Sequence, residues 1–107
     1  MFFKKKKASE ENIADREIIA HNSKAIEVLI VICEDDEIKK ELRILEEKLK
    51  YLMPSPDSKI IEHDKKIKAH IEDMKILMTK SNGTVNEKIT GTIRDLKVLI
   101  SERNSRI

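Results

Sequence analysis

A spacing of four, three, four and three residues between apolar side chains constrains this chain more than any other feature. The spacing runs from Ile38 through Leu42, Leu45 and Leu49 to Leu52. Because an α-helix repeats every 3.6 residues, it places all five side chains on one face and turns most of the intervening Lys and Glu residues toward water. The segment is therefore predicted to be an amphipathic helix that buries one face against other helices.

Three other segments have apolar residues at helical spacing, and residues typical of helix ends flank them. Ser9 is expected to cap a first helix and Ser55 a third, which has Pro at its first helical position. The segment Ser81-Asn82-Gly83 is expected to end the third helix in a left-handed turn. Thr84 is then expected to open a fourth helix through a capping box.

Four acidic residues, 34–37, interrupt the apolar pattern between the first and second helices. In a straight helix, the apolar faces before and after them would differ in direction by about 140°. Two interpretations follow. The chain breaks here with Asp35 or Asp36 as the N-cap, or one long helix turns its two halves toward different neighbours. The break is favoured, although neither Gly nor Pro is present to enforce it.

These segments predict an all-α protein, an up-down four-helix bundle, because short connections make successive helices antiparallel neighbours. The expected helices are residues 9–34, 36–52, 56–80 and 84–103. The run from Val28 to Ile32 is β-branched enough for a strand, but the helical pattern enters it from upstream, so a helix is preferred. With only two Gly and two Pro, the chain has too few turn residues for an all-β domain. The domain prediction is a disordered basic tail at 1–8 and one bundle at 9–107.

The distribution of charge argues against nucleic-acid binding. The segment Lys4 to Lys7 holds four of the 22 basic residues, which leaves 18 basic against 20 acidic residues in the rest of the chain. A duplex-binding domain concentrates Lys and Arg on one face. Here acidic and basic residues alternate along every predicted helix, so no nucleic-acid partner is expected.

Cysteine usage and hydropathy predict a cytoplasmic protein. Cys33 is the only cysteine, so it forms no internal disulfide, gives secretion no support and is expected to be a buried thiol. No apolar segment typical of a signal peptide follows the N-terminal lysines. No stretch reaches the roughly 18 continuous apolar residues that a membrane-spanning helix needs.

Motifs that carry catalytic or metal chemistry are scarce. The chain has no glycine-rich phosphate loop and no order of Ser, His and carboxylate residues typical of a triad. Its carboxylates are expected on solvated faces beside Lys, as for Glu46 and Lys50. His63 and His70 are two helical turns apart, about 10.5 Å, which is too far to share one metal ion. We therefore predict a non-enzymatic protein without metal or cofactor and with no evident small-molecule substrate.

One short segment resembles a known family. The stretch Ala20-His21-Asn22-Ser23-Lys24-Ala25 is similar to the phosphorylated segment of histidine-phosphotransfer domains, which are four-helix bundles of about this length. By that resemblance, His21 would carry the phosphoryl group and Lys24 would stabilise its charge. Ser23 stands where the family has a large apolar residue, and Ala25 replaces its usual Gly. The alternative is an ordinary exposed histidine on a helix.

The N-terminal segment combines two aromatic residues with four lysines: Phe2, Phe3, Lys4, Lys5, Lys6 and Lys7. Each lysine near an anionic lipid surface can contribute about 1 kcal/mol, and the phenylalanines could insert at the interface. This pattern suggests a peripheral membrane adaptor. The alternative is a solvated tail, which is favoured because seven residues offer little apolar area.

A few apolar residues lie off the inner faces of the predicted helices. They are Ile44, Tyr51, Ile61, Ile76 and Val98. If they converge into one patch, they form a surface for self-association or for a partner helix. Gly91 adds to this interpretation, because glycine inside a helix costs about 1 kcal/mol and permits close backbone approach. The favoured function is therefore a protein-interaction or scaffold module, with homo-oligomer formation as one form of it.

Overall fold

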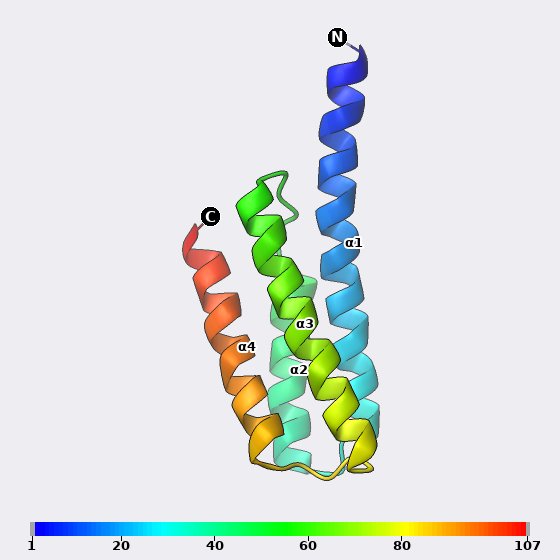
Figure 1. Cartoon of the computed structure of the whole chain (residues 1–107), viewed down its shortest axis with the longest axis vertical. Helices are drawn as coiled ribbons and strands as arrows, with labels where there is room; N and C mark the ends of the chain where they lie inside the picture. The colour runs from blue at the N-terminus through cyan, green and yellow to red at the C-terminus, as the bar shows by residue number, and fades with distance from the viewer. Residues whose placement is uncertain (1, 107) are drawn as a thin grey trace.

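The computed structural model describes the backbone of residues 2–106 and the side chains of residues 14–105. It contains four helices, which Figure 1 shows running alternately in opposite directions. They are α1 (Phe2–Ile32), α2 (Asp36–Lys50), α3 (Ser58–Lys80) and α4 (Glu87–Arg106). The described residues include no strand, and Val28 to Ile32 are helical. The predicted all-α four-helix bundle is confirmed.

The helices meet along three main interfaces. The first helix, α1, packs against both α2 and α3, and α3 packs against α4. The contact between α2 and α4 is sparse, and in the two remaining pairs, α1 with α4 and α2 with α3, the backbones do not approach each other closely. These two pairs are therefore the diagonals of the bundle. The expectation that a short connection makes α2 and α3 neighbours is wrong, because both pack on α1 instead.

The core is aliphatic, and its members follow the helical spacing of the sequence. In α2, the residues of the predicted inner face, Ile38, Leu42, Leu45 and Leu49, are buried, while Leu52 lies beyond the helix and is half-buried. The same pattern of burial holds in the other helices. Their core residues include Ile26, Leu29, Ile67, Ile71, Met74, Met78, Ile89, Ile93, Leu96 and Ile100.

The break between the first two helices is confirmed. Helix α1 ends at Ile32, and Asp35 caps α2 with its side chain. Its Oδ1 accepts hydrogen bonds from the backbone N–H groups of Glu37 at 3.0 Å and Ile38 at 3.1 Å. The cap stabilises the start of α2 and so favours a break at a place where neither Gly nor Pro enforces one. The break lets the apolar faces of both helices turn toward the same core.

The predicted start of the third helix is wrong by about two residues. Asp57, not Ser55, is the N-cap, since its side chain accepts a hydrogen bond from Lys59 N at 2.8 Å. Ser55 is held elsewhere, because its N–H donates to Asp15 on α1 and its Oγ accepts from Asp57 N. These bonds draw the loop onto the bundle before the helix begins.

The predicted capping box at Thr84 is also wrong. The chain is still turning at Thr84, whose N–H donates to Ser81 O and whose carbonyl accepts from Ser81 Oγ. Asn86 caps α4 instead, with its Oδ1 accepting from Ile89 N at 3.0 Å. At the other end of the chain, α1 begins at Phe2, so Ser9 lies inside the helix rather than at its N-cap.

The turn after α3 fixes one end of the bundle. Asn82 and Gly83 both have positive φ, 53° and 85°. Gly83 N donates to Met78 O at 2.9 Å and Asn82 N to Thr79 O at 3.3 Å, which is the Schellman pattern at a helix C-terminus. Gly83 O in turn accepts from Glu34 N at 2.9 Å. The α1–α2 and α3–α4 connections are thereby joined.

Gly83→Ala is expected to lower the free energy of unfolding by about 2 kcal/mol or more. A Cβ at this position would lie 2.1 Å from the carbonyl oxygen of Ile32, and φ is left-handed. Chemical denaturation measures the change. Gly91→Ala is the matched control, because nothing lies within 4 Å of a Cβ there. It is expected to stabilise the helix by up to about 1 kcal/mol. Equal effects of the two substitutions would contradict the described turn.

Candidate functional site

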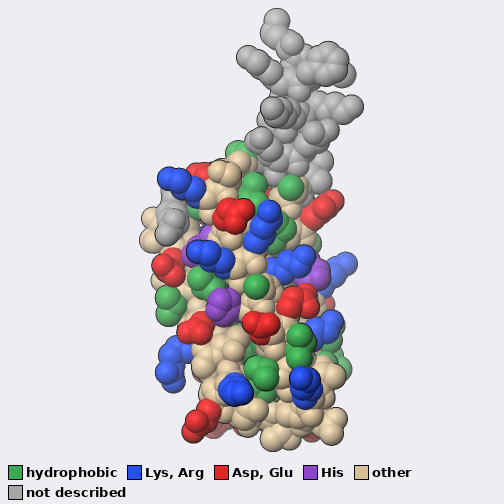
Figure 2. Space-filling view, in the orientation of Figure 1, with side chains coloured by type: hydrophobic (Ala, Val, Ile, Leu, Met, Phe, Trp, Pro, Cys, Tyr) green, Lys and Arg blue, Asp and Glu red, His purple; other side chains and the backbone are tan. Residues whose placement is uncertain are grey.

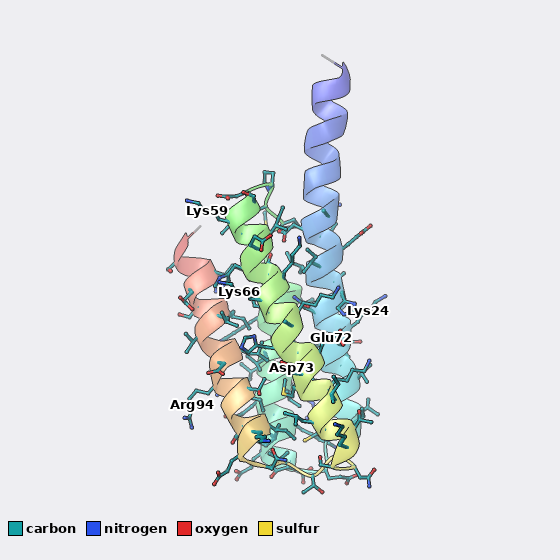
Figure 3. The ribbon with its side chains drawn as sticks, viewed as in Figure 1. Lys24, Lys59, Lys66, Glu72, Asp73 and Arg94 are labelled. Atoms are coloured by element: carbon teal, nitrogen blue, oxygen red, sulfur yellow. The ribbon has the colours of Figure 1, made fainter. Side chains whose placement is uncertain are left out.

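His21 is exposed and hydrogen-bonded across the interface between α1 and α3. Its Nε2 lies 2.7 Å from Oε1 of Glu72, and this hydrogen bond is the main cause that lowers the pKa of Glu72. Lys24 is one turn further along α1 and lines a groove on the α2 side instead; both Lys24 and Glu72 are labelled in Figure 3. A phosphoryl group on Nε2 of His21 would therefore displace a carboxylate that lies against that nitrogen.

The predicted membrane-surface residues lie outside the range in which the structure describes side chains. These are Phe2, Phe3, Lys4, Lys5, Lys6 and Lys7, whose backbone forms the start of α1. Among the described residues, no helix combines the length and the apolar character that crossing a membrane requires.

The predicted interaction residues do not gather into one patch. Ile44 lies on α2 and Tyr51 directly follows that helix, Ile61 and Ile76 lie on α3, and Val98 lies on α4. Helices α2 and α3 lie diagonally opposite each other, so their outward side chains point to different sides of the bundle. Figure 2 shows the apolar side chains of one face scattered among charged ones. Any partner surface is consequently smaller than the predicted set.

Each of the two histidines of α3 forms a hydrogen bond between a ring nitrogen and a backbone carbonyl oxygen. His63 is buried, with its Nε2 2.6 Å from Leu99 O of α4. His70 Nδ1 lies 2.9 Å from Lys66 O on the preceding turn. Within residues 14–105, no group of three or more His, Cys, Asp or Glu side chains is arranged to hold a metal ion.

Three charged side chains meet in the interior near the end of the bundle that holds the α2–α3 loop. Arg103 of α4, Asp15 of α1 and Asp64 of α3 are all fully buried. Arg103 Nε donates to Asp64 Oδ1 at 2.7 Å, and its Nη2 lies 3.5 Å from Asp15 Oδ2. We call these three residues the charge cluster. It joins helices α1 and α4, which form a diagonal of the bundle.

The charge cluster also holds the loop between α2 and α3. Arg103 Nη2 donates to the carbonyl oxygen of Met53 at 2.8 Å, and Ser55 N donates to Asp15 Oδ2 at 2.6 Å. Asn22 of α1 donates from Nδ2 to the backbone oxygen of Asp64 at 3.3 Å. The loop is therefore fastened at two places by buried charges, one on each side of Pro54.

The electrostatics of the charge cluster require a proton. Two carboxylates face one guanidinium, so full ionisation would bury a net negative charge, which is costly in a low-dielectric interior. Burial, followed by a hydrogen bond with Asp15, raises the pKa of Asp64 to about 7. Arg103 acts in the opposite direction but does not cancel this rise. Below pH 7 the cluster is predominantly neutral, with one proton on its carboxyl pair.

The sequence prediction placed carboxylates on solvated faces, and for Asp15 and Asp64 this was wrong. The signal that reveals them is register. Asp15 precedes the buried Asn22 by seven residues, and Asp64 lies four residues after Ile60 and three before Ile67. Arg103 similarly follows Ile100 by three residues. Charged residues that continue an apolar stripe in this way are candidates for a buried network.

A groove between α3 and α4 contains the fifth residue of α4, Gly91. It has a volume of about 470 Å³ and is lined by both apolar and charged residues. Its lining residues are Asp73, Ile76, Leu77, Lys88, Gly91, Thr92 and Asp95. Asp73 lies on the α4 side of α3 in Figure 3. Ile76 is thus the one predicted interaction residue that borders this hollow.

Comparison with known proteins adds no relative. The chain matches no protein-family model, no curated protein and no solved structure.

The free energy of unfolding is expected to fall as pH rises from about 4 to about 7. Folded Asp64 keeps its proton up to a pKa of about 7, whereas the ordinary value is 3.8. The folded state thus binds the extra proton in this range, and this one group lowers stability by up to about 1.4 kcal/mol per pH unit. Urea denaturation at a series of pH values measures the slope.

Asp64→Asn is the control for this slope, because it removes the titrating group and keeps the shape. The variant still contains all three histidines, so subtracting its pH profile from that of the wild type isolates Asp64. The difference is expected to slope downward with pH and to level off above pH 7. Parallel profiles would contradict a protonated cluster.

Proposed function

We propose that this protein is a non-enzymatic, cytoplasmic interaction module that binds a partner protein in the groove between α3 and α4. The observation that carries the proposal is Gly91, which borders this groove with nothing within 4 Å of the position of a Cβ. The cytoplasmic location is supported by the single cysteine, Cys33, which is free and buried.

In the isolated fold, nothing at position 91 requires a glycine. The other glycine of the chain, Gly83, is required by its positive φ and its close neighbours. Gly91 has neither restriction and lies within a helix, where it costs about 1 kcal/mol relative to Ala. The space that it leaves open would allow the backbone of a partner to approach closely.

The groove has the chemistry of a site for an amphipathic helix. Ile76 is 53% exposed beside the half-buried Leu77, so an apolar side chain of a partner can pack there. Asp73 and Asp95 form no ion pair with any side chain among residues 14–105. They are positioned to bind basic residues that flank the apolar side chain.

Charge favours a different protein over a second copy of this chain as the occupant. In a two-fold symmetric dimer through this groove, the same surface of each copy would face its equivalent. The groove carries two carboxylates against the single amine of Lys88, so such a dimer would oppose like charges. A partner helix with Lys or Arg beside its apolar face avoids that repulsion.

The test compares two substitutions of equally exposed residues. Ile76 and Val98 are both 53% exposed, but only Ile76 lines the groove. Ile76→Asp is expected to weaken binding at least about tenfold, as loss of a central interface residue does, while Val98→Asp leaves binding unchanged. The partner is recovered by affinity capture from the source cell, and its affinity for each variant is measured by titration calorimetry.

Gly91→Leu gives a second measurement that does not depend on the tolerance of the fold for a new charge. Leucine favours the helix and has open space at this position, so the variant is expected to fold and to block the groove. Loss of the same partner with both Ile76→Asp and Gly91→Leu supports the proposal. A partner that both variants retain, or that Val98→Asp also loses, contradicts it.

A further inference from the structure

A second groove lies on the other side of the molecule, between α1 and the end of α2. Its volume is about 430 Å³, within the range of small-molecule sites. Residues from α1, from the last turn of α2 and from the following loop form its walls. They are Arg16, Ile19, Ala20, Ser23, Lys24, Glu27, Lys50, Leu52 and Pro54.

The charge of this groove differs from that of the bundle around it. Arg16, Lys24 and Lys50 line it against a single acidic residue, Glu27. Residues 14–105 as a whole carry 17 basic and 18 acidic side chains, so the positive excess is local. None of the three basic side chains forms an ion pair with another side chain in that range.

Apart from its charged residues and Ser23, the lining of the groove is apolar. Ile19 is buried, Leu52 and Pro54 are half-buried, and Ala20 continues the apolar strip along α1. A strip of this kind favours a hydrocarbon chain or ring. Because cationic groups border it, the ligand that fits is apolar along its length and anionic at one end.

The loop wall of the groove is fixed before any ligand binds. Pro54 lines the groove, and its two neighbours in the chain are held by the charge cluster. Met53 O accepts from Arg103 Nη2 at 2.8 Å, and Ser55 N donates to Asp15 Oδ2 at 2.6 Å. Since both partners of the loop are fully buried charges, the wall is pre-organised, which lowers the entropic cost of binding.

From this geometry we infer that the groove between α1 and α2 binds a small anionic amphiphile, a monomeric molecule with a carboxylate head and a hydrocarbon chain. The inference goes beyond the proposed function, because it concerns different helices and a different class of ligand. The apolar strip would take the chain, and the basic residues on either side would bind the carboxylate.

In the experiment, the full-length protein is titrated with sodium decanoate, and two-dimensional NMR monitors the chemical shifts at each step. Shifts are expected to concentrate at Ile19, Leu52 and the residues beside them. Decanol and decyltrimethylammonium have the same chain with a neutral or a cationic head, so both are expected to bind more weakly. Raising the salt concentration from about 0.05 M to about 0.5 M is expected to weaken decanoate binding and to leave decanol binding unchanged.

A matched pair of substitutions tests the role of the basic residues. Lys50 and Lys48 are both exposed in the last turn of α2, but only Lys50 lines the groove. Lys50→Gln is expected to raise the dissociation constant of decanoate about threefold, a size typical of an exposed charge, and Lys48→Gln to leave it unchanged. Neither substitution removes a core contact, so both variants are expected to fold.

Two outcomes would overturn the inference. The first is equal binding of the three amphiphiles, or shifts spread over the whole bundle, which indicates unspecific hydrophobic contact. The second is binding of anionic phospholipid vesicles through Lys50 without any binding of monomeric decanoate, which assigns the basic residues to a membrane surface. Neither outcome bears on the groove between α3 and α4, so the proposed function stands or falls separately.

Discussion

The hydrogen bond from Arg103 to Asp64, with Asp15 on the other side of the guanidinium, is the contact on which the arrangement of this bundle depends. It joins α4 to α3 at 2.7 Å and reaches α1 at 3.5 Å across the diagonal of the bundle. The same guanidinium also binds the backbone of the α2–α3 loop. A charge buried this deeply is tolerated only when it is paired. The need to pair it therefore favours the observed arrangement of the four helices.

The aliphatic core alone does not determine such an arrangement. Ile, Leu and Met side chains make no directional contacts, and related packings of such side chains differ little in energy. Directional contacts lie at the two ends of the bundle. The charge cluster fixes one end, and the hydrogen bond from Glu34 N to Gly83 O fixes the other, where a side chain at Gly83 would meet Ile32 O. Between them, the sparse contact of α2 with α4 includes the ion pair of Glu41 and Lys97.

The helices and their inner faces could be predicted from the sequence, because burial follows the period of the helix. The break before α2 followed from the direction of the apolar faces on either side of it. Helix ends were less predictable. Ser55 and Thr84 have the right chemistry for caps, but the N–H of Ser55 donates to Asp15 of α1, and the N–H of Thr84 donates to Ser81 within the preceding turn. A tertiary contact therefore accompanies the first shifted helix start, and a local turn accompanies the second.

The candidate sites were harder to predict than the fold. Asp15, Asp64 and Arg103 lie far apart in the sequence, and only the packing of three helices brings them together. The spacing of each residue relative to its apolar neighbours is present in the sequence, but the general expectation that carboxylates lie on solvated faces does not distinguish Asp15 and Asp64 from the rest. Both grooves depend on the distance between helices, and the groove between α3 and α4 also depends on the side chain that is missing at Gly91. The period of a single helix contains no information on the distance to its neighbours.

Direct observation of the proton in the charge cluster tests this account most sharply. The side-chain carboxyl carbons of the aspartates can be followed by ¹³C NMR across a pH titration of the wild-type protein, with Asp64→Asn for assignment. The account predicts that the Asp64 signal titrates with a pKa of about 7. If Asp64 instead titrates at the ordinary value, the charge cluster holds no proton near neutral pH, and the account of a protonated cluster is wrong.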